Sequence, residues 1–68
     1  MDMGKFQLAM KLITEEYKLS DREVQVLTRR MLADEYEFER VWAQYRNKSR
    51  AFKGGVDKFK DLLKELLA

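Results

Sequence analysis

Residues 31–39 read MLADEYEFE, and this stretch decides whether the middle of the 68-residue chain forms one helix or two. Asp34 precedes Glu37 by three residues. At this spacing the first side chain can cap the amides of a new helix while the second reaches back to the capping residue. We therefore expect a tight corner at 33–35 and a new helix that begins at Asp34.

A single bent helix over 20–53 is the alternative. It is supported by an unbroken apolar row at intervals of seven residues, formed by Val24, Met31, Phe38, Tyr45 and Phe52. The companion row at 27, 34, 41 and 48 is interrupted by the charges of Asp34 and Lys48, whereas a helix that packs along its whole length needs both rows apolar. The interruption favours two helices over one.

The preceding segment, residues 18–24, reads KLSDREV and contains the clearest helix start in the chain. Ser20 can accept a hydrogen bond from the amide of Glu23, and the Glu23 carboxylate can accept one from the Ser20 amide in return. The apolar residues on either side of this motif form a hydrophobic staple. The pattern predicts a helix over 20–33.

The rest of the chain also favours helix, because it contains no proline, and glycine occurs only at positions 4, 54 and 55. Apolar residues at spacings of three and four predict a first helix, and the glycine pair separates the third helix from an amphipathic last one. The sequence thus predicts an all-α fold, a small bundle of three to four short helices in a single domain over 1–68. The expected helices span residues 4–18, 20–33, 34–53 and 56–67.

The chain is short, and a domain of this length buries only about 60% of the surface that its unfolded chain exposes. Such domains are usually stabilised by disulfides, a metal or a partner chain. Since Cys and His are both absent, we expect a homo-oligomer, most simply a dimer. No apolar run approaches the roughly 18 residues of a membrane span, and charges interrupt any signal sequence at the N-terminus. We expect a soluble, cytoplasmic protein that does not bind membranes.

Catalysis has little support in this composition. General acid or base catalysis at neutral pH relies on His or on carboxylates with shifted pKa values, and the chain has no His. Ser20 is explained as a helix cap, and the acidic run at 34–39 lacks the central Gly of a calcium-binding loop. We expect neither an enzyme nor a cofactor, a metal site or a small-molecule substrate.

Residues 44–55 read QYRNKSRAFKGG and contain four bases without an acid. Arg and Lys side chains neutralise phosphates, and Gln and Asn side chains can hydrogen-bond to adenine edges. Because the aromatic residues of this stretch fall on the inward face of the predicted helix, its polar residues are left outside. The candidate nucleic-acid-binding residues are Arg40, Gln44, Arg46, Asn47, Arg50 and Lys53.

The charge order of this helix has a second explanation. Acids at 34, 35, 37 and 39 lie near its N-terminus and bases near its C-terminus, as the helix dipole favours without any ligand. The dipole stabilises each charge by less than about 1 kcal/mol, and five bases over 40–56 without an acid exceed what this effect requires. We therefore predict a non-enzymatic helical regulator that binds nucleic acid as a dimer, with DNA favoured over RNA.

A protein-interaction module without nucleic-acid binding is the alternative function. Some apolar residues lie outside the principal helix stripes, namely Leu8, Leu12, Val26 and Leu32. Apolar surface that remains after a core has formed is typical of an oligomer or partner interface. In this alternative the bundle inhibits or modulates a partner protein, and the basic stripe contacts an acidic surface of that partner.

Overall fold

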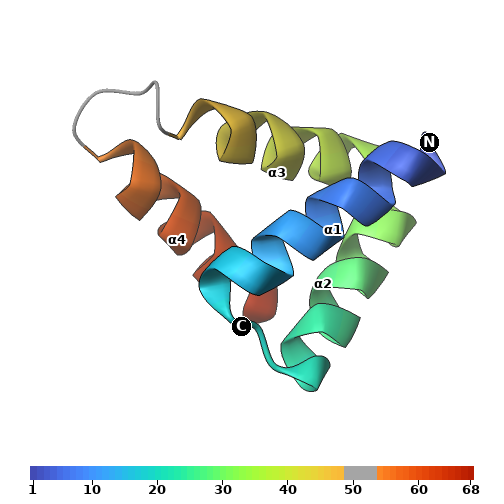
Figure 1. The fold of residues 1–68 in the computed structure, drawn as a ribbon, viewed down its shortest axis with the longest axis horizontal. Coiled ribbons are helices and arrows are strands. Elements are labelled where there is room, and N and C mark those ends of the chain that lie inside the picture. The colour runs from blue at the N-terminus through green and yellow to red at the C-terminus, as the bar shows by residue number, and fades with distance from the viewer. Residues whose placement is uncertain (49–53) are drawn as a thin grey trace.

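The computed structural model of the chain describes residues 1–48 and 54–68, and within them it contains four helices and no strand. These helices are α1 (Met3–Tyr17), α2 (Asp21–Ala33), α3 (Glu35–Asn47) and α4 (Gly55–Leu67). Figure 1 shows α2, α3 and α4 as the sides of a triangle, with α1 lying across it. The predicted all-α bundle is confirmed. None of the described helices has the length and hydropathy needed to cross a membrane.

Asp34 separates α2 from α3. Its backbone is extended, with φ −145° and ψ 105°, so the helix is interrupted at this residue. Its Oδ1 accepts a hydrogen bond of 3.0 Å from the Tyr36 amide, and its carbonyl accepts one of 3.1 Å from the Phe38 amide. The predicted corner at 33–35 is confirmed, and the alternative of a single helix over 20–53 is wrong.

Glu37 does not complete the second capping motif that its spacing predicted. Its Oε2 lies 3.2 Å from Nε of Arg40, because the guanidinium one turn along α3 offers a charged partner that the Asp34 amide does not. The full motif forms at α2 instead. There Ser20 Oγ accepts a hydrogen bond of 3.2 Å from the Glu23 amide, and Glu23 Oε1 accepts one of 2.9 Å from the Ser20 amide.

Both ends of α1 are closed by hydrogen bonds from backbone amides. Asp2 Oδ1 accepts a hydrogen bond of 3.2 Å from the Lys5 amide, so the helix begins one residue earlier than predicted. At the other end Lys18 adopts the left-handed conformation, with φ 52°. The amides of Lys18 and Leu19 both donate to the Thr14 carbonyl, a closing geometry that helices usually build with glycine.

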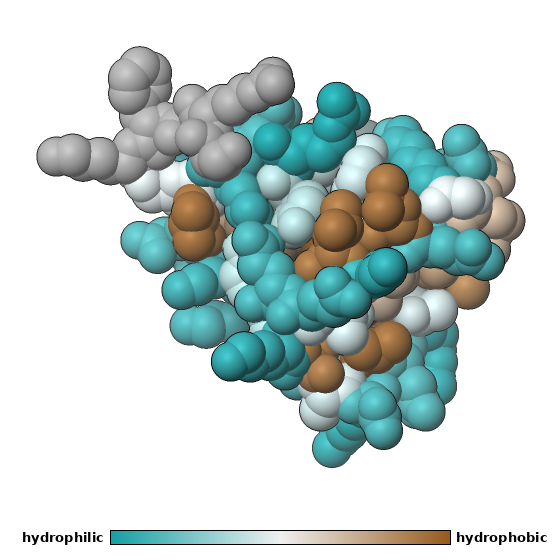
Figure 2. Space-filling model, in the orientation of Figure 1, coloured by the Kyte–Doolittle hydropathy of each residue, from teal (hydrophilic) through white to brown (hydrophobic). Residues whose placement is uncertain are grey.

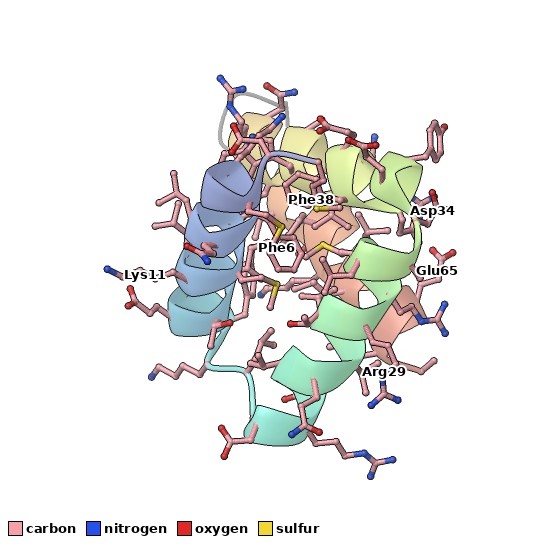
Figure 3. The ribbon with its side chains drawn as sticks, turned by 90° about the vertical axis from the view of Figure 1, so that its right-hand side faces the viewer. Phe6, Lys11, Arg29, Asp34, Phe38 and Glu65 are labelled. Carbon is pink, nitrogen blue, oxygen red and sulfur yellow. The ribbon has the colours of Figure 1, made fainter. Side chains whose placement is uncertain are left out.

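The core is formed by apolar side chains from all four described helices. Polar side chains cover much of the outer face seen in Figure 2. The largest fully buried side chains are Phe38 and Phe59, and the ring centroids of Phe6 and Phe38 lie 5.6 Å apart (Figure 3). Burying one such side chain stabilises the fold by about 1.5–3 kcal/mol. The buried set consists of Phe6, Ala9, Met10, Ile13, Leu27, Met31, Phe38, Val41, Phe59, Leu62, Leu63 and Leu66.

The described part of α3 is shorter than the predicted helix over 34–53. It ends at Asn47, and Lys48 follows as the C-cap. The rest of the prediction falls on 49–53, outside the described residues. The description resumes at Gly54, whose φ of 104° lies in the left-handed region that favours glycine, and α4 begins directly after it.

Replacing Asp34 with alanine removes the hydrogen bond that caps the Tyr36 amide at the start of α3. We expect the free energy of unfolding to fall by about 1 kcal/mol, measured by urea denaturation followed by circular dichroism. The matched control is Asp34→Asn, whose amide oxygen can accept the same hydrogen bond and which should retain most of the stability. Equal stability of Asp34→Ala and the parent protein would show that this cap does not stabilise the corner.

Candidate nucleic-acid interface

An open depression of about 290 Å³ is lined by residues from the end of α3 and the beginning of α4. Among the described residues, its polar side chains end in two amides and two amines, and none ends in a carboxylate. Two other depressions on the described surface each include at least one carboxylate. The lining residues are Gln44, Asn47, Lys48, Gly55 and Lys58.

Helix geometry explains how these side chains come together. Gln44, Asn47 and Lys48 are three and four residues apart on α3 or its C-cap, so they project from one side of the helix. Lys58 comes from the beginning of α4, and its amide donates a 2.7 Å hydrogen bond to the Gly54 carbonyl. Lys58 was not predicted as a site residue, because only the packing of α4 against α3 brings it to this place.

Lys48 is held at the edge of the depression by contacts with two other residues. Its Nζ lies 3.2 Å from Glu16 Oε1, so α1 is connected to the end of α3. The same ammonium lies 4.6 Å from the centroid of the Tyr45 ring, and only 14% of the side chain is exposed. Lys48 is therefore fixed in position, and part of its charge is neutralised by Glu16.

A row of aromatic side chains lies beneath this region. Trp42 and Tyr45 stack with centroids 6.0 Å apart, and Tyr45 meets Phe59 edge-on at 5.5 Å. Tyr17 contacts the other side of Phe59 at 5.4 Å. Trp42 and Tyr45 are partly buried against the core, as predicted for the inward face. Because these rings pack against one another and against the core, they leave little aromatic surface on which a base could stack.

Arg46 is exposed on the other flank of α3. Arg46 is two positions from both Gln44 and Lys48, which corresponds to a rotation of about 200° about the helix axis. It therefore projects from the opposite flank. Its guanidinium lies 5.9 Å from the Trp42 ring centroid, within the range of a cation–π contact. The exposed side of the C-terminal half of α3 thus has a base on each flank, with Asn47 between them.

The remaining predicted residues are not part of this arrangement. Arg40 is in contact with two carboxylates, at 3.2 Å from Glu37 Oε2 and at 3.9 Å from Glu65 Oε1. These contacts link α3 to α4 and reduce the availability of the guanidinium for a phosphate. Arg50 and Lys53 lie outside the described residues.

The predicted interface residues do not form one surface. Leu8 and Leu12 are one turn apart on α1, with Leu8 49% exposed and Leu12 half-buried. Hydrophobic side chains gather over α1 in the face that Figure 2 shows. On α2, Leu32 is 51% exposed and Val26 half-buried, and their offset of six positions along the helix makes them face about 120° apart.

Burial raises the pKa values of Tyr17 and Tyr45 above the ordinary value of 10.0. The nearby Glu16 carboxylate adds to this effect, because a phenolate beside it would bring two negative charges together. The folded protein therefore favours the neutral phenols of both tyrosines.

No protein-family model matches the chain, and no curated protein and no solved structure is similar to it. Within residues 1–48 and 54–68, no three acidic side chains come close enough together to hold a metal ion. The function is therefore inferred from the geometry of the described side chains.

The raised tyrosine pKa values predict a loss of stability at alkaline pH. Their stabilising effect is complete below about pH 10, the pKa of an unfolded tyrosine, and is lost as the pH rises through the higher folded values. We expect the double variant Tyr17→Phe, Tyr45→Phe to lose less free energy of unfolding than the parent between about pH 8 and about pH 11, in urea titrations. Lysine deprotonation affects both proteins alike, so equal losses would contradict the prediction.

Proposed function

We propose that this protein is a non-enzymatic regulator that binds nucleic acid through the exposed side of the C-terminal half of α3 and the beginning of α4. The proposal rests on the depression at this place, where the described side chains provide two amines and two amides but no carboxylate. Arg46 on the other flank of α3 adds a second cationic contact. Phosphate groups on both sides of the helix would then be neutralised.

The arrangement favours DNA over RNA. The major groove of B-form DNA is about 12 Å wide and admits an α-helix, whereas the deep, narrow major groove of RNA does not. Gln44 and Asn47 are exposed between the cationic groups, where their amides can hydrogen-bond to adenine. The N-terminal half of α3 is less suitable, because Glu35 and Glu39 are exposed there and would repel phosphates.

Binding to duplex DNA should depend steeply on salt. Lys48 is paired with Glu16, so Arg46 and Lys58 are the free cations. If each of these two neutralises one phosphate, affinity falls by about 12-fold between about 50 and 200 mM salt, since each contact contributes about 0.9 to the logarithmic slope. Fluorescence anisotropy with a labelled duplex measures this slope. An absence of binding at the lower salt concentration would contradict the proposal.

Charge reversal tests which residues carry the interaction. We expect Arg46→Glu with Lys58→Glu to abolish DNA binding while helicity by circular dichroism stays unchanged. The matched control is Lys11→Glu with Arg29→Glu, which changes the net charge equally at two exposed positions on opposite sides of the bundle (Figure 3). The control should weaken binding only slightly. Similar losses in both variants would indicate that net charge, and not this surface, attracts the DNA.

A dimer is part of the proposal, and the half-exposed Leu8 on α1 supports it. Leu8 and Leu12 follow each other on the side of α1 that faces away from the buried Phe6, Ala9 and Ile13. Packing these leucines against a second copy would remove apolar surface from water. Each Å² buried in this way would stabilise the dimer by about 25 cal/mol. The same face also supports the alternative function, a protein-interaction module that modulates a partner without binding nucleic acid.

Light scattering tests the dimer independently of DNA. We expect the parent protein to have the mass of two chains and the double variant Leu8→Ser, Leu12→Ser that of one, because the polar hydroxyls weaken an apolar contact. Val56→Ser, at a similarly exposed residue on α4, is the control and should remain dimeric. If the leucine variant keeps the mass of the parent, α1 is not the interface.

A further inference from the structure

A second depression, of about 360 Å³, lies between the C-terminal end of α1, the beginning of α2 and the last turns of α4. It shares no lining residue with the candidate nucleic-acid interface, and its surface is mainly apolar. The apolar walls come from Tyr17, Leu19, Leu63 and Leu67. Tyr17 and Leu67 are partly exposed here while also packing against the core. The depression can therefore accept an apolar group without a rearrangement of the bundle.

Two lysines give this apolar depression a positive edge. Lys60 and Lys64 are four residues apart on α4, so they project from the same side of the helix as the apolar walls. Both are exposed, and neither ammonium group is in an ion pair with another described residue.

Glu23 is the one carboxylate side chain in the lining, and it already has a partner. Its Oε1 accepts a 2.9 Å hydrogen bond from the Ser20 amide in the capping box of α2. The acid Glu65 of α4 belongs to a different side, since it lies 3.9 Å from Arg40. Ala68 also lines the depression. The side chains of the lining thus have two positive charges and one negative charge, and the two lysines at the edge favour an anionic ligand.

The shape and charge exclude several occupants. A two-fold dimer through this surface would bring together two linings in which lysines outnumber carboxylate side chains, which is unfavourable. The apolar walls do not suit a phosphate backbone, which binds to polar and basic side chains. The depression is also open, whereas small-molecule sites bury most of their ligand. A protein segment fits better, because one of its side chains can enter while the rest covers the edge.

We propose that this depression is a docking site for an acidic segment of a partner protein. One large apolar side chain of the segment packs between Leu63 and Leu67, and carboxylates on either side of it pair with Lys60 and Lys64. The inference is independent of the nucleic-acid proposal, since it uses a different surface.

Amide NMR of the isotope-labelled full chain tests the site with three blocked peptides. The first has a central Leu-Phe flanked on both sides by aspartates, the second has serines in place of Leu-Phe, and the third has asparagines in place of the aspartates. We expect saturable shifts of the Leu63, Lys64 and Leu67 amides with the first peptide and much weaker ones with the other two. Equal shifts with the second or third peptide, or shifts confined to Gln44 and Asn47, would overturn the proposal.

Variants then separate a docking site from general attraction. Lys60→Glu with Lys64→Glu should weaken binding of the first peptide by about tenfold or more, because two ion pairs are replaced by repulsion. Lys11→Glu with Arg29→Glu makes the same change in charge elsewhere and should bind like the parent. Both lysines are exposed, so the variant is expected to fold, which circular dichroism checks.

Unchanged binding in the lysine variant would overturn the proposal. The same holds if light scattering shows that this variant has lost an oligomer that the parent forms, because the depression would then be occupied by a second copy of the chain.

Discussion

The turn at Asp34 is the constraint on which the rest of the structure depends. One residue in extended conformation divides the middle of the chain into α2 and α3, and both of these short helices then pack against each other and against α4. A continuous helix over 20–53 would be about 50 Å long at 1.5 Å per residue. The described residues extend over only 30 Å in their longest direction. Without the turn, Phe38 on α3 would not share a core with Leu27 on α2.

The same turn determines where the candidate interface lies. Because α3 runs back across the bundle, its C-terminal end comes close to the end of α1, where Lys48 meets Glu16 at 3.2 Å. The aromatic contacts from Tyr17 through Phe59 to Tyr45 join α1, α4 and α3 at this point. The exposed amides of Gln44 and Asn47 thus lie on the same helix as the partly buried Tyr45. The proposed binding surface and the core contacts are on opposite faces of α3.

Local patterns in the sequence predicted the elements well, because they depend on neighbours in the chain. The capping box at Ser20 and the corner at Asp34 required only short-range hydrogen bonds, and both form. Contacts between side chains of different helices were not predicted. Arg40 was expected to face solvent, yet Glu65 of α4 lies 3.9 Å away, and Lys58 joins the site only through packing. Spacing along one helix contains no information about the charges of another.

Both ion pairs and apolar burial hold α1 against the rest of the bundle. Which of them contributes more free energy decides how strongly added salt destabilises the fold. Lys5 pairs with Glu39 at 3.1 Å and Lys48 with Glu16 at 3.2 Å, so added salt weakens two contacts between α1 and the α3 region. Exposed pairs of this kind contribute at most about 1 kcal/mol each. Burial of Phe6 alone contributes about 1.5–3 kcal/mol, and α1 also buries Met10 and Ile13. The apolar contribution is larger and does not depend on screening, so the bundle should keep its fold over the salt range in which phosphate contacts weaken.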